Sequence, residues 1–272
     1  MKKSNKRTKK KRKLLLGVLC LVFASVFIFS AYKVYTIIHG YNEAEKRYDL
    51  LMQSVLAADA AASAQGDDTA PAAETDPGST EKDSSPVTVD FDELAKISDY
   101  VVGWLYLPDT VINYPVAQYR DNEYFLDRFI DGKVQVGGTL FVDCSCPGDF
   151  SGQNSVIYGH NMRDGSMFAC LDDFGEQEFY NAHPVIYLST PTCDYRIEVF
   201  SAFTTSAVSY VYTTFFPYAS SFDDHISALR YMSEIKSEVE VGPDDRIVTL
   251  STCAYSFDDA RFVVIGKLVP ME

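Results

Sequence analysis

The sequence predicts a mainly β protein: a closed or nearly closed eight-stranded β-barrel with a few helices, preceded by an N-terminal transmembrane helix. The 272 residues are 47% hydrophobic and include 18 Phe and 18 Tyr, which is enough for a packed core. Short β-branched and aromatic runs, punctuated by Gly, Pro, Asn and Asp, recur from residue 101 onward. Many short strands with few helices are typical of a barrel.

The N-terminal segment predicts a membrane anchor. Nine Lys and Arg residues lie within residues 2–13, and residues 14–32 then run without a charge. A helix over this run spans about 28 Å, close to the hydrocarbon thickness of a bilayer. Bulky residues follow it instead of a small-residue cleavage site, which favours an uncleaved anchor over a signal peptide. We therefore expect a cytoplasmic tail at 1–13 and an anchor at 14–38, with the rest of the chain outside the cell.

The segment between the anchor and the domain covers residues 39–86. Its first part, 41–56, can continue as a juxtamembrane helix. Residues 57–86 are rich in Ala, Asp, Ser, Thr and Pro and contain almost no large apolar residues, so they predict a flexible tether. We expect the globular domain at 87–272, which is long enough for one core.

Three helices are expected in the domain. Asp90 followed by Glu93 fits an N-cap, so a short helix begins there and ends near residue 98. A longer helix is expected at 222–236, because apolar residues recur there at helical spacing. A shorter one is expected near 167–174.

The eight expected strands follow from β-branched and aromatic runs bounded by turn residues. They lie at 101–107, 111–116, 139–142, 155–159, 185–188, 195–203, 246–250 and 262–268.

The charge distribution excludes several classes of partner. The net charge is -14, but nine of the 24 basic residues lie in the tail, so the remainder sets 15 basic residues against 38 acidic ones. Such an acidic body argues against nucleic acid, because phosphate binding needs cations. No cluster of carboxylates suggests a metal site, with Asp258 and Asp259 interpreted as loop charges. No glycine pattern suggests a nucleotide, so neither cofactor nor metal is expected.

The cysteines single out one candidate nucleophile. Cys20 lies in the anchor, and an odd number follows it, so at least one thiol is unpaired within the exported domain. Cys144 and Cys146 lack the Cys-x-x-Cys spacing and are interpreted as loop thiols or half of a disulfide. Cys170 and Cys193 are expected to be buried or disulfide-bonded. Cys253 ends an apolar strand, where a nucleophile can be held rigidly, although a buried small hydrophobe is the alternative.

A thiol attacks as thiolate and needs a base or a cation nearby. His160 directly follows a strand and a glycine, whereas His39 is expected at the membrane interface and His183 and His225 at the surface. Arg261 begins the last strand and returns to the same rim, where a guanidinium can bind an anionic tetrahedral oxygen. The alternative is an exposed Arg261 paired with Asp258 or Asp259.

These residues resemble the sortases, cysteine transpeptidases of Gram-positive bacterial surfaces. Thr-Leu-Ser-Thr-Cys at 249–253 matches the TLxTC signature, Tyr-Gly-His-Asn at 158–161 matches the histidine segment, and Arg261 matches the essential arginine. The finer resemblance is to class B. It rests on the long helix before the cysteine strand and on four segments: FDEL at 91–94, VGWL at 102–105, YPV at 114–116 and DNEYFL at 121–126.

The resemblance implies a catalytic trio of His160, Cys253 and Arg261. It implies cleavage of a C-terminal sorting motif after Thr, a Cys thioester, and transfer to an amine of a peptidoglycan precursor or a pilin. Four positions match the class B motif groove: Asn122, Leu126, Tyr158 and Ser251. Ala254 stands where some members have a polar residue, so NPQTN-like, PxTG-like and LPxTG-like motifs all stay open.

Three other functions remain open at this point. A pilin-polymerising sortase and a hydrolytic cysteine peptidase would use the same residues, and their products would separate them. A non-enzymatic surface receptor or adhesin would instead have a buried or disulfide-bonded Cys253.

Overall fold

The computed structural model describes residues 4–56, 85–254 and 259–271. The expected tether at 57–86 lies outside the described residues, apart from its last two positions. The chain forms two compact units, residues 1–47 and 48–272, and each is described by itself.

The first unit is most of a single long helix, α1 (Ser4–Val55). The helix is unbroken from the predicted anchor into the predicted juxtamembrane segment, as expected. Within it, an 18-residue window has a mean hydropathy of 2.4 and none of it is buried. By length and composition, α1 can cross a membrane.

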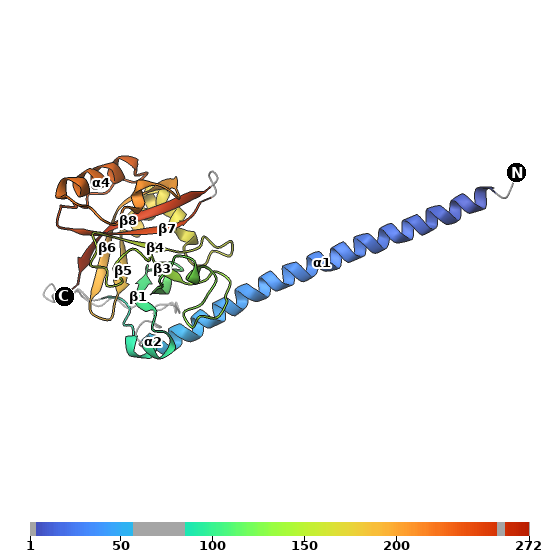
Figure 1. Cartoon of the computed structure of the whole chain (residues 1–272), viewed down its shortest axis with the longest axis horizontal. Helices are drawn as coiled ribbons and strands as arrows, with labels where there is room; N and C mark the ends of the chain where they lie inside the picture. Colours follow the sequence, from blue (N-terminus) through green and yellow to red (C-terminus); the bar gives the residue numbers. More distant parts are fainter. Residues whose placement is uncertain (1–3, 57–84, 255–258, 272) are drawn as a thin grey trace, which may run out of the picture. The chain divides into compact units, whose positions relative to one another are not determined.

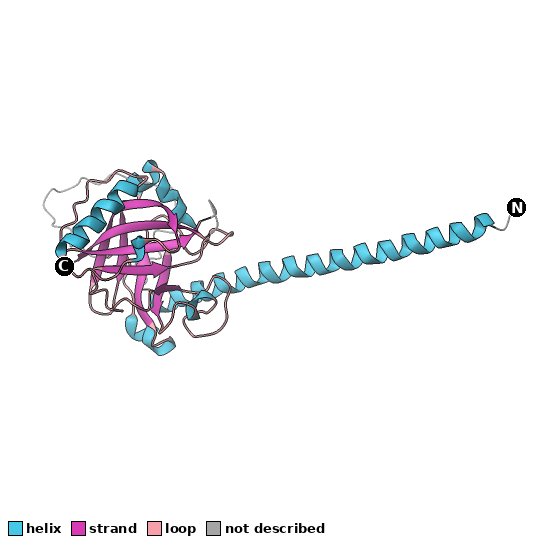
Figure 2. Ribbon diagram, turned by 45° about the horizontal axis from the view of Figure 1, so that its top comes forward, coloured by secondary structure: helices cyan, strands magenta, loops and turns pink. Residues whose placement is uncertain are grey.

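The described part of the second unit is built around eight strands that close into a barrel in the order β1-β2-β3-β4-β7-β8-β6-β5 (Figures 1 and 2). The predicted fold class is therefore confirmed. The barrel is mixed, because β2 with β3 and β4 with β7 are parallel pairs and the other pairs are antiparallel. The strands are β1 (Val101–Tyr106), β2 (Asn113–Gln118), β3 (Leu140–Val142), β4 (Asn154–Tyr158), β5 (Val185–Ser189), β6 (Asp194–Ser206), β7 (Arg246–Cys253) and β8 (Ala260–Pro270).

The main core extends further toward the N-terminus than residue 87. Tyr48, Leu51 and Val55 are buried in the same cluster as Trp104 and Leu105 of β1. Their spacing of three and four residues puts them on one face of α1, which therefore joins the packed unit. The sequence did not predict that these residues belong to the core, because residues 57–86, which follow them, lack large apolar side chains.

A local cap sets the start of one helix, and a contact with a strand sets the end of another. Helix α2 (Phe91–Ile97) begins as predicted, with the Asp90 carboxylate accepting a hydrogen bond from the Glu93 amide at 2.9 Å. Helix α4 (Ala219–Met232) ends four residues before the predicted limit. The chain leaves the helix there because the Glu234 amide donates to the Ala202 carbonyl of β6.

The segment expected as a helix near 167–174 is a 3-10 helix, η3 (Ala169–Gly175). A helix that the sequence patterns did not predict, α3 (Gln177–Ala182), follows it. Two further 3-10 turns, η2 (Tyr124–Leu126) and η4 (Tyr210–Tyr212), lie in the connections that border the site.

The prediction that His225 lies at the surface is wrong. His225 is 5% exposed and packs against the rings of Tyr210 and Phe216, at 5.7 and 4.8 Å between centroids. It lies three residues after Phe222, on the apolar face of α4, so the packing of that face buries it. Burial lowers the pKa of His225 to about 4.

Candidate active site

The proposed catalytic residues lie at neighbouring strand ends. Strands β4 and β7 run parallel, with Tyr158 opposite Ser251, so both reach the same rim of the barrel. Strand β8 returns antiparallel to β7 and places Arg261 directly opposite Cys253. His160 comes two residues after the end of β4. The expectation that these three residues share a rim agrees with the register.

A groove of about 300 Å³ opens at this rim. All seven residues that the sequence singled out line it: Asn122, Leu126, Tyr158, His160, Ser251, Cys253 and Arg261. They come from four separate parts of the sequence, so their convergence is a property of the fold. The groove walls also include residues that the sequence did not indicate, among them Tyr212 and Phe141.

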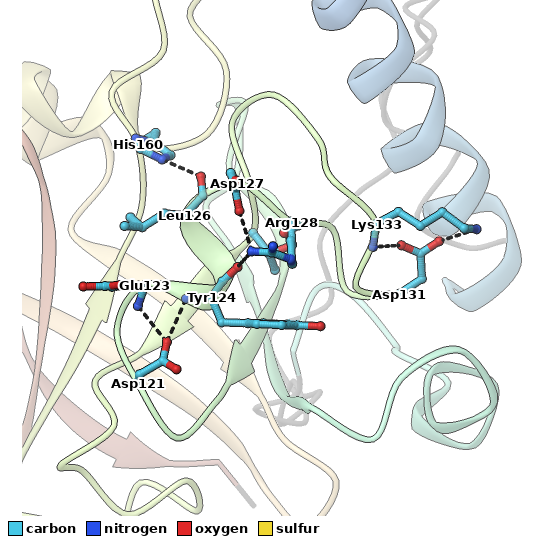
Figure 3. A network of polar contacts seen from close by, with 10 residues as sticks. Asp121, Glu123, Tyr124, Leu126, Asp127, Arg128, Asp131, Lys133 and His160 are labelled. Carbon is cyan, nitrogen blue, oxygen red and sulfur yellow. Dashed lines mark hydrogen bonds and ion pairs between the residues drawn. The ribbon is translucent and has the colours of Figure 1, made fainter.

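His160 is held by the backbone of the opposite wall. Its Nε2 lies 2.8 Å from the carbonyl oxygen of Leu126 (Figure 3). Because a carbonyl oxygen only accepts hydrogen bonds, Nε2 carries a proton in this contact, and Nδ1 is the nitrogen left to exchange protons. No hydrogen bond joins His160 to Cys253 among the described residues. Such catalytic contacts often tighten only when substrate binds.

Cys253 is half-buried, and its backbone is held in place from the β4 side. The Asn161 side-chain nitrogen Nδ2 donates to the Cys253 carbonyl at 3.0 Å and to Asp172 at 2.8 Å. Burial raises the pKa of Asp172, although the bond from Asn161 opposes that shift. The asparagine of the 158–161 segment therefore anchors the end of the strand that carries the cysteine.

Arg261 leaves its positive charge in the groove. In the part of the chain that the structure describes, its guanidinium donates only to the Ala260 carbonyl, at 2.9 Å, and pairs with no carboxylate. Asp259 is exposed, and Asp258 lies outside the described residues. The charge of Arg261 also acts on the nearby Tyr212. Burial raises the pKa of the Tyr212 phenol, and a hydrogen bond to Ser251 and the charge of Arg261 partly oppose this shift.

Comparisons with known proteins agree with this geometry. The family described as "Sortase domain" matches residues 105–269. The chain is 34% identical over 253 residues to Sortase B of Listeria monocytogenes, which covers 92% of this chain and 95% of the relative. The chain belongs to the sortase family.

Solved sortase B structures have the same fold. A Staphylococcus aureus sortase B–substrate complex superposes with a TM-score of 0.64 at 31% identity, covering 67% of this chain and 86% of that one. Sortase B from Bacillus anthracis gives a TM-score of 0.63 at 35% identity, covering 68% and 85%. This sortase is therefore a class B enzyme, a cysteine transpeptidase of the cell wall.

Asp143 organises one wall of the sortase groove. Its Oδ2 accepts hydrogen bonds from the Asn122 side-chain amide at 2.8 Å and from the Tyr158 hydroxyl at 3.0 Å. Its Oδ1 accepts from the amide and the hydroxyl of Ser145, at 2.8 and 2.7 Å. Burial opposes ionisation, but these donors outweigh it and hold the pKa of Asp143 below its usual range. No sequence pattern singles out Asp143, because its role depends on side chains 15 and 21 positions away.

Tyr212 lines the groove and was not indicated by the sequence. Its hydroxyl lies 2.9 Å from the Ser251 Oγ, and its ring lies 6.1 Å from that of Tyr158. It comes from η4, in the connection between β6 and α4. That connection has no hydrophobic period, so no local signal distinguishes Tyr212 from its aromatic neighbours.

The other cysteines differ from Cys253 in their surroundings. All six thiols are free, so neither Cys170 nor Cys193 forms the disulfide that was considered for them. Burial raises the pKa of Cys170 to about 11 and the pKa of Cys146 above its usual range. Cys253 is instead a free, half-buried thiol in the groove, which contradicts the requirement of the receptor alternative.

Proposed function

We propose that Cys253, His160 and Arg261 carry out transpeptidation on a C-terminal sorting motif of the NPQTN or PxTG type, and that a cell-wall amine is the acceptor. The observation that carries the proposal is the single groove that all seven candidate residues line. A cysteine thiol, an imidazole and a guanidinium at one rim are the groups that thiol acyl transfer requires.

The first half-reaction forms a thioester. The Cys253 thiolate attacks the carbonyl carbon of the motif's Thr, and the resulting oxyanion accepts hydrogen bonds from Arg261. The Thr–amide C–N bond then breaks, and His160 gives a proton to the leaving amine. With Nε2 bonded to the Leu126 carbonyl, Nδ1 is the nitrogen that delivers this proton.

The second half-reaction reverses these roles. An incoming amine attacks the thioester carbon, His160 takes the proton from that amine, and the Cys253 thiolate leaves. The thioester conserves the energy of the acyl group until an amine arrives. Solved structures of sortase B with a substrate and with triglycine support a peptide donor and an amine acceptor for this chain.

The motif is proposed to bind along Asn122, Leu126, Tyr158 and Ser251. Asn122 is fixed on Asp143, and Ser251 is fixed on Tyr212, so both present a defined polar atom. An ordered polar atom loses little conformational entropy when substrate binds.

The proposed topology places the N-terminus in the cytoplasm and the catalytic domain outside the cell. It is supported by the nine basic residues that precede the apolar part of α1. Protease added to cells stripped of their wall should digest the domain, and protection alongside a digested exported control would contradict this orientation.

The decisive experiment is a peptide panel. The full chain in detergent micelles is incubated with NPQTN, PxTG and LPxTG peptides, with and without triglycine, and the products are read by mass spectrometry. The proposal predicts an amine-dependent ligation product after Thr that the Cys253→Ala variant does not form. Hydrolysis alone at saturating amine would favour the peptidase instead, and ligation only to a pilin lysine would indicate a polymerising role.

A further inference from the structure

The Leu126 carbonyl that holds His160 belongs to a loop that joins β2 to β3. Local hydrogen bonds shape this loop (Figure 3). Asp121 accepts bonds from the amides of Glu123 and Tyr124, at 3.0 and 2.9 Å, and the Leu126 amide donates to the Glu123 carbonyl at 3.1 Å. These contacts shape the turn, but none of them bears on the Leu126 oxygen itself.

Gly138 is the residue that supports that oxygen from behind. Its φ is +58°, and a Cβ at this position would lie 2.6 Å from the Leu126 oxygen. Such a close approach requires glycine, so the Gly138 backbone lies directly against the peptide that carries the Leu126 carbonyl. The next residue continues this contact, because the Thr139 amide donates to the Phe125 carbonyl at 3.0 Å.

Tyr48 in turn fixes Gly138. Its hydroxyl donates to the Gly138 carbonyl at 2.7 Å across 90 positions of sequence. The ring is 5% exposed and packs edge-on against Tyr114 and Phe129, with centroids 4.9 and 5.2 Å away. Burial raises the pKa of Tyr48 well above its usual range, so the hydroxyl remains a donor.

We propose that Tyr48 is a positioning residue for catalysis: through Gly138 and Leu126 it sets the orientation and tautomer of His160. The inference rests on the proposed catalytic role of His160. Its consequence is that the last turns of α1 belong to the catalytic machinery as well as to the core. A chain cut at residue 87 would lose this support.

The test is the Tyr48→Phe variant of the full chain, which removes the hydroxyl and keeps the ring. Losing one buried hydrogen bond should lower kcat about fivefold and leave KM for the sorting peptide nearly unchanged. The limb of the pH–rate profile that reports loss of the imidazolium proton should move to lower pH, because Leu126 then stabilises that proton less well.

The matched control is Tyr180→Phe. Tyr180 is also buried, and its hydroxyl donates one hydrogen bond at 2.8 Å, but to Ser237 and not to the β2–β3 loop that carries Leu126. Its unfolding midpoint should fall about as much as that of Tyr48→Phe, while its kcat and pH profile stay at wild-type values. Nitrogen NMR of ¹⁵N-histidine-labelled chain should show His160 with a proton on Nε2 in wild type and a mixture of tautomers in Tyr48→Phe.

If wild type is active and His160→Ala is inactive, the proposed function stands. In that case, unchanged kcat, pH profile and tautomer in Tyr48→Phe would overturn only the inference about Tyr48. The same holds if Tyr48→Phe and Tyr180→Phe lose equal activity. An inactive wild-type chain would overturn the proposed function itself.

Discussion

The two walls of the groove are built differently. One wall, here called the strand wall, consists of Tyr158, Ser251, Cys253 and Arg261, which are fixed by the ladders of β4, β7 and β8. The other, the loop wall, consists of Asn122, Leu126 and Tyr212, which lie in connections between strands. The loop wall is held by individual hydrogen bonds: Asn122 bonds to Asp143 and to the Cys144 amide, and Tyr48 bonds to Gly138, which lies against Leu126.

This difference suggests a division of labour. Backbone ladders fix atoms cooperatively, so the strand wall suits the reacting groups, which need tight placement. Single bonds to side chains can be altered one at a time, so the loop wall suits the recognition of a particular motif. Substitutions in the strand wall should then abolish most of the activity, whereas substitutions in the loop wall should reduce it only partly.

The largest effect is expected at Cys253. Cys253→Ala should lower peptide cleavage by at least about a thousandfold and leave the fold intact, because no acyl-enzyme can form. Cleavage is measured by mass spectrometry, and folding by circular dichroism. Cys144→Ser is the matched control, since this exposed thiol lies outside the groove, and it should keep nearly full activity. A folded but inactive Cys144→Ser would contradict the assignment.

The next effect is expected at Arg261, opposite Cys253. Arg261→Lys should lower kcat roughly a hundredfold, because an ammonium lacks the planar fork that can bind an oxyanion. Binding of the peptide to a Cys253→Ala background should weaken much less, as measured by calorimetry. Near-normal turnover of Arg261→Lys would show that Arg261 does not stabilise the oxyanion.

His160→Ala should lower the rates of both half-reactions by a similar factor and abolish the bell shape of the pH–rate profile.

The same contrast decides what the sequence could predict. The strands that carry Cys253 and Arg261 are marked by β-branched runs, and His160 is marked by its place just after a strand and a Gly, so these three residues follow from local patterns. The loop wall depends on contacts between distant positions, such as Asp143 with Asn122 or Tyr48 with Gly138. No periodicity encodes those contacts. The family resemblance alone indicated Asn122, Leu126, Tyr158 and Ser251, and nothing in the sequence indicated Asp143 or Tyr212.

A graded effect is expected at Asp143. Asp143→Asn removes the charge that holds Asn122 and Tyr158, so KM for the sorting peptide should rise by about three- to tenfold with little change in kcat. Asp149→Asn is the matched control, because Asp149 also accepts a hydrogen bond from the amide two residues later in the chain, whereas the bonds to Asn122 and Tyr158 belong to Asp143. Since the folded pKa of Asp143 is depressed, its stabilising effect is present above the ordinary aspartate range and is lost as the pH falls below it. A kcat loss with unchanged KM would place Asp143 in the chemistry instead.

The smallest effect on activity, and the sharpest separation of the two walls, is expected at His225. Its ring packs on Tyr210, the first residue of the same 3-10 turn that ends at Tyr212, so its protonation should loosen the loop wall first. The folded pKa of about 4 lies below the ordinary value of 6.5, so the unfolded chain binds the proton more readily. Stability should therefore fall as the pH drops from 6.5 toward 4, by about 2 kcal/mol between pH 7 and pH 5.

The test is the His225→Phe variant, in which this pH dependence of stability disappears. Its cleavage of the peptide at pH 7 should match wild type because the Phe ring still fills the site of the His ring. Urea unfolding of both chains at pH 7 and pH 5 measures the difference, and hydrogen exchange locates it. Equal pH dependence in the two chains, or exchange that rises first in β7 and β8, would show that His225 does not control the loop wall.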